Sequence, residues 1–166
     1  MPTCPSCSAE IAAGARWCGI CHANVLDAAI GSLASPGKRF GAYVLDLLAP
    51  MVALFLIFVV AGMGVATGTE EGAGLGLPLG FLLFGAYVGW AFVLFATRGT
   101  TPGKWLLGMR VVTEDGRTAG FLTMLIREWV GKVISGLILM LGFLWILLDR
   151  DKQGWHDKLM STFVVR

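Results

Sequence analysis

The chain has 166 residues, of which 56% are hydrophobic and 14% are charged, and its mean hydropathy is +0.75. An ordinary soluble domain has about 25% charged residues, and a core of this size could not bury so much apolar surface. The composition therefore excludes a soluble globular protein and predicts an integral membrane protein in a lipid bilayer. The net charge of +2 is too small to indicate nucleic-acid binding, so we expect no nucleic-acid partner.

All four cysteines lie near the start of the chain, in the stretch CPSCSAEIAAGARWCGIC. They form two CxxC pairs, Cys4 with Cys7 and Cys18 with Cys21, and ten residues separate the pairs. This spacing is typical of a zinc ribbon, in which four thiolates hold one structural Zn²⁺ and leave no open position for catalysis. Two disulfides are the competing interpretation, which a cytoplasmic N-terminus disfavours.

These patterns divide the chain into three predicted regions. Residues 1–22 form the zinc ribbon, residues 23–37 form a linker of small and polar residues, and residues 38–166 form a transmembrane domain. The first ten residues lack the basic and then apolar pattern of a cleavable signal peptide. We therefore expect the first apolar helix to remain as an anchor.

Two uncharged stretches are long enough to cross a bilayer as helices. There are 23 such residues between Asp46 and Glu70, and 26 between Glu71 and Arg98. The first connecting loop has no Lys or Arg, whereas the region 98–120 has four. By the positive-inside rule, we expect a multi-pass protein of the inner membrane whose N-terminus is cytoplasmic.

A third hydrophobic segment, residues 133–148, has 16 uncharged residues and is slightly short for a span. The basic tail and two β-like runs, RVV and TFVV, which could pair only on one side of the membrane, favour a re-entrant element or a tight helical hairpin turning near Gly142. A plain third span is the alternative. The predicted fold class is thus an all-α membrane protein with two transmembrane helices and a third re-entrant, hairpin or spanning segment, preceded by the zinc ribbon.

Asp46 interrupts the apolar character of the first predicted helix. A lone carboxylate there costs about 2.5 to 3.5 kcal/mol on insertion scales. Arg39 lies seven residues earlier and therefore on nearly the same face of a helix. One hypothesis is that Asp46 forms a cation or proton site. The other is a buried ion pair with Arg127, Lys132 or another basic residue that fixes helix packing.

Several motifs together resemble the RDD family over residues 36–166. They are Arg39, Ala42 and Asp46 in the first helix, and the stretches TPGKWLLGMRVV, REWVGK and QGWHDKLMSTFVV. The resemblance implies a small prokaryotic membrane protein, named for one arginine and two aspartates, for which transport of unidentified ligands is the usual suggestion. It implies Arg39 and Asp46 as the first two residues and Asp157 as the third, with Asp149 as a rival. Further network candidates in these motifs are Arg127, Glu128, Lys132 and His156.

The leading hypothesis is a protein that moves or senses a small cation or proton through a site containing Asp46. Because two or three segments are few for a transporter, we expect a homo-oligomer or a partner membrane protein. The competing hypothesis is an assembly protein whose zinc ribbon recruits a cytoplasmic protein. We do not expect an enzyme, since His156 and Asp157 have no accompanying nucleophile elbow or open metal site.

Overall fold

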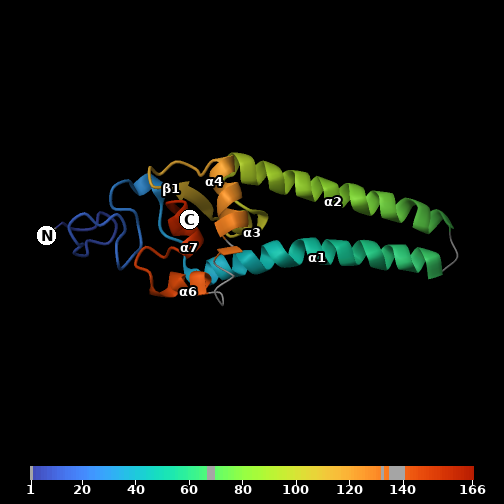
Figure 1. Cartoon of the computed structure of the whole chain (residues 1–166), viewed down its shortest axis with the longest axis horizontal. Helices are drawn as coiled ribbons and strands as arrows, with labels where there is room; N and C mark the ends of the chain where they lie inside the picture. Colours follow the sequence, from blue (N-terminus) through green and yellow to red (C-terminus); the bar gives the residue numbers. More distant parts are fainter. Residues whose placement is uncertain (1, 67–69, 132, 135–140) are drawn as a thin grey trace.

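Two long apolar helices form an antiparallel hairpin that extends from a small folded head (Figure 1). Helix α1 covers Pro36–Ala66 and helix α2 covers Glu70–Arg98. The computed structural model describes residues 2–66, 70–131, 133–134 and 141–166. The helices approach closely at Gly80, where a Cβ atom would lie 2.7 Å from Cγ1 of Ile57.

Both helices are long and apolar enough to cross a membrane. The stretches Pro36–Gly62 and Leu77–Arg98 meet the requirement, and 6% of the most apolar window in each is buried inside the molecule. Their outward side chains are large and apolar, for example Phe55, Phe58 and Phe92. Such continuous apolar surface suits the hydrocarbon of a bilayer rather than water.

The remaining elements form the head, which consists of residues 2–35, 99–131, 133–134 and 141–166 and lies at one end of the hairpin (Figure 1). Its elements in chain order are η1 (Ala28–Ile30), α3 (Pro102–Leu106), β1 (Arg110–Thr113), α4 (Phe121–Ile126), η2 (Arg127–Gly131), α6 (Leu141–Leu148), α7 (Trp155–Leu159) and β2 (Thr162–Val165). Strands β1 and β2 pair antiparallel, with Val111 opposite Val164. These two valines are buried against Met109, Met124 and Ala42 of α1, so the sheet packs on the base of the first long helix.

The sheet corrects one part of the predicted fold class. The fold is mostly helical, as expected, but β1 and β2 make it more than an all-α protein. Helix α4 and strand β2, which precede and follow the third hydrophobic segment, both lie in the head. Among the described residues, two helices are long enough to span a membrane. Gly142 lies within α6, and Lys132 and residues 135–140 lie outside the described residues.

The four-cysteine module packs directly on the sheet. The rings of Trp17 and Phe163 have centroids 5.3 Å apart, and both side chains are buried with Val112 and Val165. Leu33 forms a β-bridge with Val165. The segment 23–37, for which the sequence predicts a linker, carries η1 and this bridge. The segment between the cysteine module and the start of α1 is therefore folded and hydrogen-bonded to the sheet.

Candidate functional site

A fully buried carboxylate, Asp157, joins three separate parts of the chain. Arg39 of α1 donates from Nη1 to Oδ2 of Asp157 at 2.8 Å. Arg127 of η2 donates from Nε and Nη2 to Oδ1 at 2.8 and 2.6 Å. The amide of Gly154, just before α7, donates to Oδ2 at 3.2 Å. Asp157 thus caps its own helix and holds two arginines that are distant in sequence.

The arginines keep Asp157 ionised in spite of its burial. Burial alone raises the pKa of this carboxyl, but the charge of Arg127, followed by those of His156 and Arg39, outweighs burial and holds the pKa well below its usual range. The pKa of Arg127 is raised in return. Burial lowers this pKa, but the carboxylates of Asp157 and of the neighbouring Glu128 raise it by more. The group is therefore a set of mutually stabilised charges.

Glu128 extends this group to the loop after α2. Its Oε1 accepts hydrogen bonds from Nη1 of Arg127 at 2.6 Å and from Nζ of Lys104 at 2.7 Å. Arg127 and Glu128 are consecutive residues of the π-helical turn η2, a conformation that is frequent at functional sites. We call Arg39, Lys104, Arg127, Glu128 and Asp157 the charge cluster.

Arg39 also links the cluster to the backbone of the head. Its Nε donates to the carbonyl of Ala34, and its Nη2 donates to the carbonyl of Val164 in β2, both at 3.3 Å. The guanidinium thus contacts the segment before α1, strand β2 and helix α7 at once. The position of α1 relative to the head depends on this single side chain more than on any other in the cluster.

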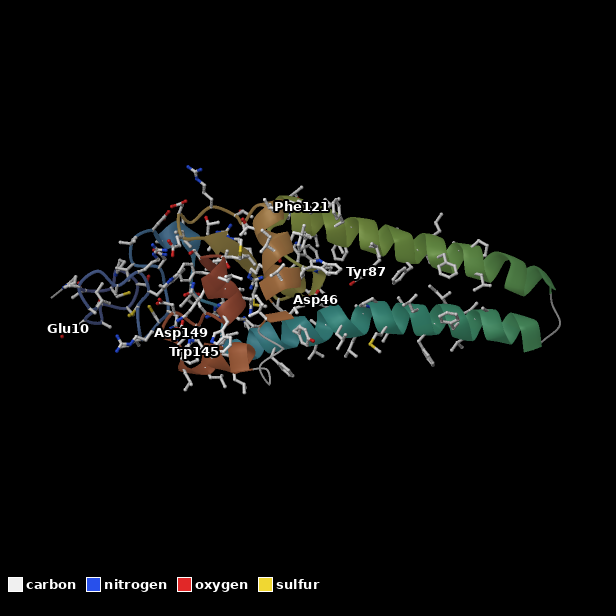
Figure 2. All side chains as sticks on the ribbon, in the orientation of Figure 1. Glu10, Asp46, Tyr87, Phe121, Trp145 and Asp149 are labelled. Atoms are coloured by element: carbon white, nitrogen blue, oxygen red, sulfur yellow. The ribbon has the colours of Figure 1, made fainter. Side chains whose placement is uncertain are left out.

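Asp46 binds the start of α3 instead of a basic residue. Thr101 donates its hydroxyl to Oδ2 at 2.5 Å, and the amide of Gly103 donates to Oδ1 at 2.6 Å. Figure 2 shows Asp46 on the part of α1 nearest the head. The predicted pair with Arg127 is wrong, because Arg127 binds Asp157 and Glu128. Lys132, the other named partner, lies outside the described residues.

Gly103 allows α3 to lie directly on α1. A Cβ atom at this position would be 2.3 Å from the carbonyl oxygen of Ala42 and 3.0 Å from the carboxyl carbon of Asp46. Pro102, at the first turn of α3, lacks an amide hydrogen that would otherwise need a partner. The TPGK stretch therefore folds as a short helix whose first free amide meets the carboxylate of Asp46.

A cavity of about 480 Å³ brings the predicted polar residues together. Arg39 and Asp46 both line it, as their spacing on one helix face predicts. The polar part of its lining also includes Lys104, Arg127 and His156, and the apolar part includes Phe40, Tyr43, Leu144, Ile146 and Leu147. Asp149 does not line this cavity. It accepts hydrogen bonds from Lys158 and from the amide of Gln153.

The sequence alone does not indicate the roles of Lys104 and Thr101, because these roles depend on contacts with residues far away in the chain.

The four cysteines form a separate site at the far end of the head. All four Sγ atoms lie within 4.8 Å of one another, with 3.7 Å between Cys4 and Cys21 and 3.6 Å between Cys7 and Cys18. Tetrahedral ligands at about 2.3 Å from a Zn²⁺ ion lie about 3.8 Å apart, whereas disulfide sulfurs are about 2.0 Å apart. The geometry suits a closed metal site.

The hairpin and the charge cluster define a class, that of small membrane proteins with paired charges at the base of two apolar helices. The model of the RDD family matches residues 33–161, and the chain belongs to this family. It is 29% identical over 130 residues to the uncharacterized protein YckC of Bacillus subtilis (strain 168), covering 76% of this chain and 80% of YckC. No solved structure matches the chain significantly.

We expect Gly103→Ala to destabilise the protein by about 1–3 kcal/mol, because the added methyl group overlaps the Ala42 carbonyl and the Asp46 carboxylate. Chemical unfolding in detergent micelles measures this loss. Gly89→Ala is the matched control, since a Cβ atom there meets open space. Equal stability of the two variants would show that α3 does not pack on α1 in this way.

We expect His156 to make the folded state less stable in acid. Burial lowers the pKa of His156 to about 4, although the charge of Asp157 opposes this effect. Above the pKa of about 6.5 that His156 has in the unfolded chain, the imidazole is neutral in both states and the free energy of unfolding is not reduced. As the pH falls towards 4, the unfolded chain binds the proton more tightly than the folded protein, so stability is lost. The free energy of unfolding should fall by about 2 kcal/mol more between pH 7 and pH 5 in the wild type than in His156→Gln. Equal declines in both proteins would exclude His156 as the titrating group.

Proposed function

We propose that this RDD-family protein moves or senses a small cation or a proton at the carboxylate of Asp46. The observation that carries the proposal is that Asp46 lines the cavity while its hydrogen-bond partners are neutral groups, the Thr101 hydroxyl and the Gly103 amide. Each carboxylate oxygen has one such donor and can accept another bond. A proton or a small cation in the cavity would be the group that compensates this charge.

The other charged side chains that line the cavity have ion-pair partners within the charge cluster, whose three cations and two carboxylates leave a net charge of +1. Arg39 pairs with Asp157, Arg127 pairs with Asp157 and Glu128, and Lys104 pairs with Glu128. Asp46 has no ion pair with any residue in the part of the chain that the structure describes. This difference separates Asp46 from the structural charges around it and supports a role in binding.

The position of Asp46 in α1 suits a site inside the membrane. It lies seven residues after Arg39, which corresponds to about 10 Å along a helix. We place the head in the cytoplasm and the hairpin in the inner membrane, since the basic residues concentrate at the head end. Two spanning helices enclose little space, so a pathway across the membrane would form between copies of the chain or with a partner membrane protein.

We further propose that the four cysteines hold a structural Zn²⁺ ion. Their sulfur spacing supports tetrahedral coordination, and a module of this size has too small a core to fold alone. Zinc would keep Trp17 against Phe163 and thereby stabilise the contact between the ribbon and the sheet.

Asp46→Asn tests the proposed site, with Thr101→Val as the matched control. Thr101→Val removes the hydrogen bond to Oδ2 and keeps the carboxylate, whereas Asp46→Asn removes the ionisable group and keeps a side chain of the same shape. In liposomes with a pH-sensitive dye, we expect cation-driven proton movement in the wild type and in Thr101→Val, and none in Asp46→Asn. Thermal unfolding confirms that all three proteins are folded.

Absence of flux in the wild type would contradict transport. Equal loss of flux and of stability in both variants would make Asp46 a structural cap of α3. In either case, the search for function would move to what the ribbon binds.

The zinc proposal predicts one Zn²⁺ per chain in the purified protein, measured by mass spectrometry of the metal content. Cys18→Ser should lose the metal, because a closed site needs all four thiolates. His22→Asn is the control: His22 directly follows the ligand Cys21, and Asn tolerates its φ of 58°. Loss of zinc in the control, or its retention in Cys18→Ser, would contradict the four-cysteine site.

A further inference from the structure

A second hollow, of about 580 Å³, lies where the end of α2 meets the sheet and the turn around η1. Three arginines line it, Arg98 at the end of α2, Arg110 at the start of β1 and Arg166 after β2. We call this hollow the arginine groove. It shares no lining residue with the cavity that contains Asp46, so it is a separate site.

No acidic side chain balances the positive charge of the groove. Among the residues that the structure describes, no Asp or Glu lines the groove, and none of its arginines has an ion pair. Arg110 donates to the Ala29 carbonyl at 3.4 Å, and Arg166 donates to the Ser32 hydroxyl at 3.2 Å. Each guanidinium has five N–H donors, so these contacts leave most of them available.

The groove lies at the level where the apolar part of α2 ends. Arg98 is the last residue of the stretch Leu77–Arg98, which is long enough to span a membrane. Trp105, which also lines the groove, is 43% exposed and stacks edge-on against Trp90 of α2, with ring centroids 5.5 Å apart. Tryptophan is enriched at the boundary between hydrocarbon and water. The groove therefore opens at the depth of the lipid headgroups.

We propose that the arginine groove binds the phosphate of an anionic phospholipid headgroup. Guanidinium groups match phosphate oxygens with paired hydrogen bonds, and three of them without an acidic side chain beside them favour a ligand with net negative charge over a zwitterionic one. The site is built from α2, β1 and β2, so a bound lipid would hold the base of the hairpin against the sheet. A soluble phosphate has the same recognition chemistry and serves as a competitor in the test.

Native mass spectrometry of the detergent-solubilised full chain tests this proposal with phosphatidylglycerol, phosphatidylcholine and inorganic phosphate as probes. The site variant carries Arg98→Gln and Arg110→Gln. The control carries Arg117→Gln and Arg150→Gln, which removes the same charge from exposed residues that do not line the groove. We expect the wild type and the control to retain phosphatidylglycerol in preference to phosphatidylcholine. The site variant should bind it about 25-fold more weakly, on the basis of about fivefold for each of the two arginines.

Three results would overturn the proposal. Equal weakening in the site and control variants would indicate a general charge effect, and equal retention of the two lipids would exclude selection of an anionic headgroup. Displacement of phosphatidylglycerol by an equimolar amount of inorganic phosphate would make the groove a soluble-anion site. If the double variant does not fold, Arg98→Gln alone decides the question. The Arg98 side chain makes no hydrogen bond or ion pair with the residues that the structure describes, so we expect this variant to fold and to bind the lipid about fivefold more weakly.

Discussion

The structure depends on one buried carboxylate, Asp157, and on the two arginines that neutralise it. An ionised group without water is stable only when it is paired and fully hydrogen-bonded, and Asp157 meets both conditions through Arg39, Arg127 and its own helix cap. Removing one partner would leave the others as buried, uncompensated charges. The base of α1, the π-helical turn η2 and helix α7 can therefore pack together only as a set. Strand β2 follows α7 at once, so this set also fixes the sheet.

The buried ion pairs also determine which charged groups of the cavity are paired. Each cation of the charge cluster has an ion pair with Asp157 or Glu128, so its arginines and Lys104 serve mainly to hold the walls in place. Asp46 belongs to a different group of contacts, in which α3 is fixed to α1 by an amide and a hydroxyl. The same cavity thus combines a rigid frame of paired charges with one carboxylate whose hydrogen-bond partners carry no formal charge.

Sequence reasoning succeeded where the signal is local. Hydrophobic length predicted both apolar helices, cysteine spacing predicted the sulfur cluster, and helical periodicity placed Arg39 and Asp46 on one surface. It failed where partners are distant. The pairing of Arg39 with Asp157 joins residues 118 positions apart, and no periodic pattern indicates which acid binds which base. For the same reason, the ion pair considered between Asp46 and Arg127 is wrong, and the sequence does not predict the packing of Trp17 on Phe163.

The wide sequence separation within the charge cluster has a consequence for biogenesis. When α1 leaves the ribosome and enters the membrane, the acid that neutralises Arg39 has not yet been synthesised. Until then, the long side chain of Arg39 must extend into the headgroup region, where water and lipid phosphates solvate it. Closure of the head also has to wait for β2, because Leu33 and Val112 are covered by that strand. Insertion of the hairpin therefore precedes folding of the head, and elements translated after the hairpin, α7 and β2, complete the attachment of the first helix.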